Sequence, residues 1–202
     1  NFLQTKNIIE LILNYKKDCK FLFCGSSHMF SPKKKEKYTL INEKNNYEPK
    51  NYYGLTKAAG VNLVKYFRNF REFLGYNVIL FNHESPKRPK DFVSRKITNF
   101  VANTRLKIKE NMSNKKLKIN NINSLVDWSH AKDIVMGMHL VLQKSHPSDF
   151  ILASGKPHSV KEFLQISFEK VNLNWKDFVE FDQNCNEDKN CLVGDPAKAI
   201  KL

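Results

Sequence analysis

The stretch Phe21-Leu22-Phe23-Cys24-Gly25-Ser26-Ser27 decides the fold class, because a continuous apolar run passes directly into small and polar residues. Such a run is typical of a strand that is buried on both faces, as the strands of parallel sheets are. Two later runs have the same form, Val78-Ile79-Leu80-Phe81 and Phe150-Ile151-Leu152-Ala153. The sequence therefore predicts three short strands of one parallel sheet.

Helical periodicity fills the segments between and beyond these runs. Apolar residues recur every three or four positions over residues 3–18, 54–73, 92–108, 131–143 and 160–171. We expect Gly75 to end the second helix, since a glycine commonly follows the last helical turn, and the polar residues 31–50 to form a loop. Strands alternating with helices predict an α/β fold, whose sheet is covered on both faces and binds ligands at the carboxyl ends of its strands.

The composition fits a globular protein. The chain has 202 residues, of which 41% are hydrophobic and 27% charged, enough for one or two domains with a core. No run approaches the ~20 apolar residues that a membrane span requires. The start, Asn1-Phe2-Leu3-Gln4, has neither Met nor the pattern of a signal peptide, and it falls inside a predicted helix. We therefore expect a fragment of a longer, cytoplasmic protein.

Cysteines and charge narrow the possible partners. Cys19, Cys24, Cys185 and Cys191 include no C-x-x-C pair, so no metal site is expected. So few thiols indicate a reducing compartment, although a disulfide between Cys185 and Cys191 stays open. The formal charge of +14 permits a nucleic-acid or polyanionic partner. Because the Lys residues are spread along the chain among many Asn, we favour a charged surface, and nucleic acid is not an expected partner.

Tyr53 and Lys57 lie four residues apart at the start of the second predicted helix, so they share one helix face. An ammonium beside a phenol stabilises the phenolate and lowers its pKa, which yields a proton acceptor for an alcohol that is being oxidised. The spacing also arises by chance in a Lys-rich chain with seven Tyr. Its place after the strand that ends at Ser26 and Ser27 favours catalysis, because a hydroxyl there can hold the substrate oxygen. A helix cap or turn is the alternative for both Ser.

This order of Ser, Tyr and Lys resembles the extended short-chain dehydrogenase/reductase enzymes that act on nucleotide sugars. Further blocks are similar to the GDP-mannose 4,6-dehydratase family: residues 80–88 (LFNHESPKR), 92–97 (FVSRKI), 127–133 (DWSHAKD) and 158–163 (HSVKEF). The resemblance covers nearly the whole chain and weakens after about residue 175. It implies the dehydration of GDP-mannose to GDP-4-keto-6-deoxymannose by internal hydride transfer through NADP, a lyase reaction of GDP-fucose biosynthesis, in a cytoplasmic homodimer or tetramer.

The resemblance also implies a domain plan, an incomplete Rossmann-type parallel sheet with helices and a smaller α/β substrate-binding lobe. Residues 1–83 match the back half of the Rossmann domain, with contributions from about 131–155. Residues 84–130 and 156–202 match the lobe. The seven glycines, at 25, 54, 60, 75, 137, 155 and 194, build no G-x-x-G-x-x-G loop, so the pyrophosphate-binding loop is expected upstream of this chain.

The resemblance assigns roles residue by residue. Ser26 matches the catalytic Thr and Ser27 its neighbour beside the sugar. Tyr53 would remove the proton of the 4-hydroxyl, while Lys57 would hold the nicotinamide ribose and tune Tyr53. Tyr53 and Lys57 also match cofactor contacts, together with His83 and Arg88, for which a polar turn is the alternative. Nucleotide-sugar contacts match Asn82, Ser94 and Lys96, whereas Asp127, Trp128 and His130 are expected to be structural.

The chain departs from the family pattern at catalytically important positions. The Glu that acts in the elimination of water is replaced by His28, a residue that can serve as a base. The Tyr-Gly pair that follows is Phe30-Ser31, and an Arg that would contact the substrate phosphate is Val126. A catalytically inactive relative that keeps the fold and binds a partner subunit or nucleotide sugar is therefore the alternative. A basic nucleic-acid binder, based on charge alone, is the third hypothesis.

Overall fold

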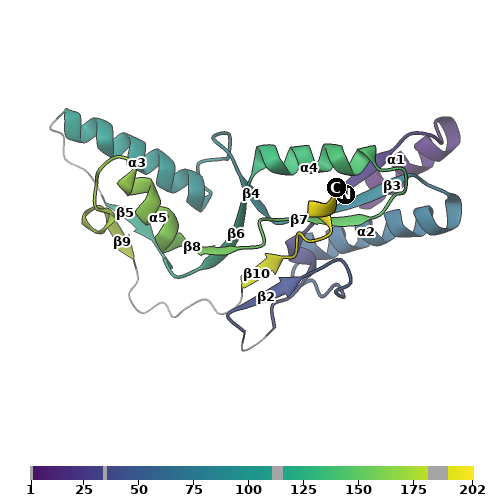
Figure 1. The fold of residues 1–202 in the computed structure, drawn as a ribbon, viewed down its shortest axis with the longest axis horizontal. Coiled ribbons are helices and arrows are strands. Elements are labelled where there is room, and N and C mark those ends of the chain that lie inside the picture. The colour runs from purple at the N-terminus through teal and green to yellow at the C-terminus, as the bar shows by residue number, and fades with distance from the viewer. Residues whose placement is uncertain (1, 34–35, 111–115, 182–190) are drawn as a thin grey trace.

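The computed structural model describes residues 2–33, 36–110, 116–181 and 191–202. They form an elongated molecule, with a helix-covered sheet at one end and a smaller lobe at the other (Figure 1). No helix within these ranges is long and apolar enough to cross a membrane. The disulfide left open for Cys185 lies outside the described residues.

The main sheet has three parallel strands in the order β1-β3-β7. They are β1 (Phe21–Ser26), β3 (Gly75–Leu80) and β7 (Asp149–Leu152). Each overlaps a predicted apolar run, so the α/β class and the parallel sheet are confirmed. β1 is joined to β3 through α2 (Tyr52–Arg71), and β3 is joined to β7 through the lobe and α4 (Ala131–Gln143).

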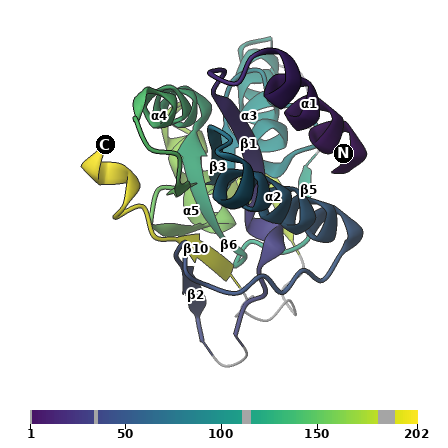
Figure 2. The same ribbon diagram turned by 90° about the vertical axis from the view of Figure 1, so that its right-hand side faces the viewer.

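Helices cover both faces of the sheet (Figure 2). α2 packs on β1 and β3, α1 (Phe2–Tyr15) lies against α2, and α4 lies on the opposite face. The alternation of side chains along β3 explains this arrangement, since Ile79 packs in the same core as Val61 of α2, whereas Val78 packs with Ile134 of α4. All three strands are therefore buried from both sides.

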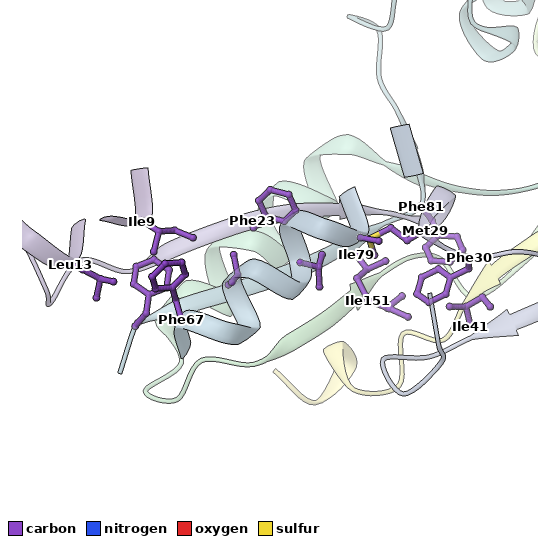
Figure 3. Close-up of a cluster of buried hydrophobic side chains, with 14 residues drawn as sticks. Ile9, Leu13, Phe23, Met29, Phe30, Ile41, Phe67, Ile79, Phe81 and Ile151 are labelled. Carbon is purple, nitrogen blue, oxygen red and sulfur yellow. The ribbon is translucent and has the colours of Figure 1, made fainter. Parts of the chain in front are cut away.

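The larger core runs between α2 and the sheet and continues to the carboxyl ends of the strands (Figure 3). Ile9 and Phe67 lie at one end of this cluster, and Met29 and Phe30 lie at the other. Met29 is completely buried and Phe30 is 4% exposed. Because these two residues directly follow His28, the core fixes the backbone of the turn after β1.

The lobe is built from α3 (Val93–Lys109) and α5 (Val160–Glu169), which pack on short strands. The strands form two small sheets, one of β4 (Asn82–Glu84), β6 (Leu125–His130) and β8 (Pro157–Ser159), the other of β5 (Leu117–Ile119) and β9 (Val179–Phe181). Most of these strands have three residues, which is too short for the periodicity that indicates a strand. They were not predicted from the sequence.

The prediction of a loop over residues 31–50 is wrong for β2 (Tyr38–Ile41). β2 pairs in parallel with β10 (Cys191–Gly194), and Cys191 lies opposite Tyr38. Thr39 and Ile41 are buried while Tyr38 and Leu40 are exposed, the alternation of a strand with one covered face. The polar residues around β2 concealed this pattern, and its partner lies far away in the sequence.

The expected end of α2 at Gly75 is also wrong. The helix ends at Arg71, and Glu72 takes the left-handed conformation with φ of 53° while its N–H bonds to the Phe67 carbonyl. Gly75 is instead the first residue of β3, where a Cβ would press on the Val64 and Phe73 side chains. Gly75 therefore allows β3 to pack closely on α2, and Glu72 adopts the left-handed conformation that ends the helix.

The lobe is joined to the sheet by the buried carboxylate of Asp127, which lies on β6 and is 1% exposed. It accepts hydrogen bonds from the Ser154 hydroxyl at 2.6 Å, the Ser154 N–H at 2.9 Å and the Gly194 N–H at 3.0 Å. Ser154 follows β7 and Gly194 ends β10, so one side chain connects three separate strands.

The neighbours of Asp127 are structural as well. The Trp128 ring packs against Phe163, with ring centroids 5.1 Å apart. The His130 Nδ1 atom accepts a hydrogen bond from the Lys132 N–H at 3.1 Å and caps α4. Asp127, Trp128 and His130 thus each make a structural contact.

A buried ionic network holds the amino-terminal end of β7. Both Arg68 guanidinium nitrogens Nη1 and Nη2 lie 3.0 Å from Asp149 Oδ1, and Lys65 Nζ lies 3.0 Å from Oδ2. The Asn77 amide donates to Oδ1 at 2.8 Å. Because the carboxylate is 9% exposed, these donors replace water around it.

The two edges of the main sheet differ. On β7, the Ile151 N–H that points away from β3 donates to the Glu43 carboxylate at 2.9 Å, so a charged side chain covers this edge. On β1, β3 is the single strand partner among the described residues. The open side of β1 thus retains the ability to pair with a further strand.

Candidate active site

β1 ends at Ser26, whose buried side chain caps the turn that follows, η1 (Ser27–Met29). The Ser26 Oγ accepts a hydrogen bond from the His28 N–H at 3.2 Å, so Ser26 caps the turn, and its catalytic role stays a prediction. Ser27 is half-buried and His28 is exposed. The turn therefore presents the His28 side chain at the carboxyl end of β1.

α2 begins directly beside this turn. The Asn51 Oδ1 caps the helix by accepting a hydrogen bond from the Gly54 N–H at 2.7 Å. Gly54 approaches η1 so closely that a Cβ would collide with the His28 carbonyl oxygen. Glycine thereby brings Tyr53 to His28, and their ring centroids lie 5.7 Å apart in an edge-to-face arrangement. The Tyr53 side chain remains half exposed.

One turn further along α2, Lys57 joins the group. Its Nζ donates a hydrogen bond to the Cys24 carbonyl at 2.8 Å and lies 5.7 Å from the centroid of the Tyr53 ring. An ammonium carries three donors, so this bond leaves others for a ligand oxygen. The structure brings together all four predicted catalytic residues, Ser26, His28, Tyr53 and Lys57.

A second group forms where the chain leaves β3. Ser94, which is 5% exposed, donates a hydrogen bond from its Oγ to Glu84 Oε2 at 2.5 Å. The same oxygen lies 3.3 Å from Arg88 Nε, and the Arg88 guanidinium stacks 3.6 Å above the centroid of the Phe92 ring. Glu84 thus connects a predicted cofactor contact, Arg88, with a predicted substrate contact, Ser94.

The remaining predicted residues lie around these two groups. Asn82 is exposed on β4, two residues beyond Leu80, which is paired with Ser26. His83 Nδ1 donates a hydrogen bond to the Phe81 carbonyl at 2.9 Å. Lys96 is held apart, since its Nζ donates to the Lys118 carbonyl of β5 at 2.8 Å.

Two hollows lie in the lobe. One of about 440 Å³ is lined by Glu84 and Ser94 and has Trp128 and Phe163 on its wall. The other, of about 560 Å³, lies between α3 and α5 and is lined by none of the predicted site residues. The smaller hollow therefore belongs to the candidate site, although the larger one is the more apolar.

Two residues of the site were missed by the sequence analysis. Asn51 stands just before an apolar helical pattern, which is the position of a helix cap, so this signal was available. Glu84 lies inside a block that matched the family, but nothing in the sequence indicates that its carboxylate meets Arg88 and Ser94.

The residues present fit the nicotinamide side of a dinucleotide. Lys57 has donors left over and Tyr53 is half exposed beside it. The buried Arg88 Nε lies 3.3 Å from Glu84 but is not aligned for a hydrogen bond, so it has no hydrogen-bond acceptor in the described part of the chain. These donors suit the hydroxyls and phosphates of a nucleotide. No group of three His, Cys, Asp or Glu residues within the described ranges is arranged to hold a metal ion.

Comparisons with known proteins identify the family of this chain. The family described as GDP-mannose 4,6 dehydratase matches residues 1–201. GDP-mannose 4,6 dehydratase 1 of Arabidopsis thaliana is 38% identical over 188 residues, which are 91% of this chain and 49% of the relative. The chain therefore spans about half the length of this curated relative.

Solved structures support the fold. RMD from Pseudomonas aeruginosa, complexed with NADPH, has a TM-score of 0.81 at 16% identity, covering 98% of this chain and 64% of the other. The dTDP-glucose 4,6-dehydratase of Bacillus anthracis, in complex with NAD, has a TM-score of 0.78 at 14% identity, covering 98% and 59%. Both are nicotinamide-binding proteins with a Rossmann-like fold. By its match over residues 1–201, the chain belongs to the GDP-mannose 4,6-dehydratase family.

Proposed function

We propose that the protein containing this chain dehydrates GDP-mannose to GDP-4-keto-6-deoxymannose, with NADP as its hydride carrier. The observation that supports this most strongly is the grouping of Ser26, His28, Tyr53 and Lys57 at the carboxyl end of β1. A bound nicotinamide would supply the redox chemistry, taking hydride from sugar carbon 4 and returning it to carbon 6. Proton transfer and the positioning of the substrate are carried out by side chains of the protein.

Tyr53 acts on the 4-hydroxyl of the sugar. Its phenolate accepts the hydroxyl proton as carbon 4 is oxidised to a ketone, and the Lys57 ammonium, 5.7 Å from the ring centroid, stabilises the negative charge. Ser26 and Ser27 hold the substrate oxygen at the end of β1. The ketone makes the carbon 5 hydrogen acidic.

His28 takes part in the elimination that follows. The carbon 5 proton and the carbon 6 hydroxyl leave together as water, so that the product differs from GDP-mannose by one water molecule. His28 is adjacent to Tyr53 and stands at the position of the elimination residue. In this chain it replaces a carboxylate, so the side chain at this step differs in chemistry from that of the family.

The remaining site residues divide between cofactor and substrate. Tyr53, Lys57, His83 and Arg88 hold the cofactor, and the substrate contacts come from Ser27, Asn82, Ser94 and Lys96. The cofactor side comprises residues 1–83 and about 131–155. The substrate-binding lobe comprises residues 84–130 and 156–202, whose last strand, β10, reaches back beside β2.

The assembly is a cytoplasmic homodimer or tetramer. Exposed aromatic side chains on α2, Tyr66 at 54% and Phe70 at 71%, support self-association through that helix. Sedimentation of the protein expressed from its complete reading frame is expected to give a dimer or tetramer. A monomer at all concentrations would contradict this assignment.

The reaction is tested with the same protein, NADP and GDP-mannose, following the 4-keto-6-deoxy sugar by NMR. Product formation supports the dehydratase. Binding of GDP-mannose without product formation favours the alternative, an inactive relative. His28 and Val126 motivate this alternative, because both replace family residues. In that case His28→Glu combined with Val126→Arg is expected to produce turnover, whereas turnover by the unmodified protein excludes the alternative.

Glu84→Gln is expected to weaken nucleotide and nucleotide-sugar binding by about tenfold, roughly the 1.4 kcal/mol that one charge-assisted contact contributes. The amide still accepts from Ser94 but no longer neutralises Arg88. Binding is measured by titration calorimetry, and Glu180→Gln, an exposed residue of the same lobe, is the control. Equal affinities for both variants would show that Glu84 does not organise the site.

A further inference from the structure

The Asn51 side chain lies between the first turn of α2 and the His28 imidazole. Its Oδ1 accepts a hydrogen bond from the Gly54 N–H at 2.7 Å, and its Nδ2 lies 3.4 Å from His28 Nδ1. The first contact fixes which end of the amide faces which neighbour. A backbone N–H can only donate, so the oxygen faces Gly54 and the NH₂ group faces His28.

The orientation of the amide determines where His28 carries its proton. An amide NH₂ group offers hydrogens and no lone pair, so a hydrogen on His28 Nδ1 would oppose another hydrogen. The arrangement is favourable when Nδ1 presents its lone pair, and a neutral imidazole then holds its proton on Nε2. The contact between Asn51 Nδ2 and His28 Nδ1, at 3.4 Å, is long for a hydrogen bond. A hydrogen on Nδ1 would face the amide hydrogens across the same distance, so the lone pair is still the favourable arrangement.

The backbone around this contact is fixed from several sides. Ser26 caps η1 through the His28 N–H, and Met29 is buried directly after it. A Cβ on Gly54 would strike the His28 carbonyl oxygen, so α2 and η1 approach each other closely at this point. The alignment of Asn51 with His28 is therefore a property of the fold.

We infer that Asn51 is a positioning residue that fixes His28 in the Nε2–H tautomer, so that His28 meets the sugar as a neutral hydrogen-bond donor instead of a proton acceptor. His28 Nε2 makes no hydrogen bond within the described ranges, so its N–H is available to a sugar oxygen. This assignment rests on the proposed function for the identity of the ligand, but the tautomer itself does not.

The consequence concerns the elimination step. A proton acceptor needs a lone pair directed at the carbon 5 hydrogen, and the Nε2–H tautomer has none there. Removal of that proton by His28 first requires the ring to exchange tautomers against the Asn51 amide. His28 therefore supports binding and polarisation of a sugar oxygen, and proton removal is slow.

Asn51→Asp provides the decisive variant. Aspartate remains a good helix cap through one oxygen, and its second oxygen replaces the NH₂ group opposite His28. A carboxylate accepts from Nδ1–H, so the tautomer reverses and Nε2 acquires the lone pair. Asn51→Ser is the matched control, because it keeps the cap but is too short to reach the imidazole.

The tautomer is measured by ¹⁵N–¹H NMR of the histidine-labelled protein from its complete reading frame, without substrate or cofactor, at about pH 8.5, where an ordinary imidazole is neutral. His28→Gln identifies the resonance. We expect protonated Nε2 in the wild type, protonated Nδ1 in Asn51→Asp and a mixture in Asn51→Ser. A wild type protonated on Nδ1, or indistinguishable from Asn51→Ser, overturns the assignment.

A second readout connects the tautomer with chemistry. With GDP-mannose and NADP in D₂O, Asn51→Asp is expected to exchange the carbon 5 hydrogen at least about tenfold faster than Asn51→Ser. A reversed tautomer with unchanged exchange would refute the contact between Nε2 and the sugar. If the tautomers are as expected but no variant, including wild type, acts on GDP-mannose, the role of Asn51 stands and the proposed function fails.

Discussion

Replacing Tyr53 with phenylalanine is expected to lower kcat for GDP-mannose by about 10²- to 10⁴-fold, the usual contribution of a positioned acid or base. The change removes one oxygen and keeps the ring that packs against His28 at 5.7 Å. Binding of GDP-mannose is expected to change little, because the lobe supplies most of its contacts. Turnover is measured by the appearance of the 4-keto sugar, and binding by calorimetry.

The neighbouring Tyr52 provides a matched control, since it occupies the same helical turn and is 88% exposed. Tyr52→Phe is expected to behave as the wild type in kcat and in thermal unfolding. Equal losses of kcat in both variants would show that the effect comes from a disturbed start of α2. A Tyr53→Phe protein with unchanged kcat would show that Tyr53 does not act in the proposed mechanism.

Asp149→Asn is expected to lower the free energy of unfolding by about 3 kcal/mol, because it leaves the Arg68 and Lys65 cations without their counter-ion. Arg68 is 16% exposed and Lys65 is 31% exposed, so water only partly replaces the carboxylate. Urea unfolding measures the change. Asp18→Asn is the control, because its pair with Lys16 is largely solvent-exposed and is expected to contribute little.

The same carboxylate predicts a dependence of stability on pH. Burial alone would raise the pKa of Asp149, but the hydrogen bond from Asn77 and the charges of Arg68 and Lys65 outweigh it and hold the pKa below its ordinary value. Its contribution to stability is complete above the unfolded pKa of about 3.9 and is lost as the pH falls through the folded pKa. Wild type should therefore destabilise below about pH 4 more steeply than Asp149→Asn.

Sequence reasoning succeeded where local pattern and burial coincide. The three apolar runs became β1, β3 and β7, and the helix predicted over residues 131–143 is α4 with the same bounds. Such elements bury residues on a regular period, and that period can be read without knowing their neighbours.

Sequence reasoning failed for elements whose stabilising partner lies far away in the sequence. β2 is stabilised by β10 across most of the chain, and its polar neighbours resemble a loop. The left-handed cap is Glu72, whereas the glycine expected to end the helix, Gly75, packs closely on Val64 and Phe73, and local propensity reports neither.

In the candidate site, too, features within one element were predicted and contacts between elements were not. The Tyr53–Lys57 spacing could be read from one helix, and His28 was identified through the resemblance to the family. The contacts from Asn51 to His28 and from Glu84 to Arg88 and Ser94 depend on side chains placed by different elements. No spacing in the sequence indicates them.

The carboxylate of Asp127 also bears on the order of folding. Its partners Ser154 and Gly194 lie 27 and 67 residues further along the chain, so two long loops must close before it can lose its water. A buried carboxylate is unfavourable until all its donors are in place. These bonds are therefore expected to form after the rate-limiting barrier has been crossed. Weakening them would accelerate unfolding while leaving the folding rate nearly unchanged, so Asp127 governs the lifetime of the native state.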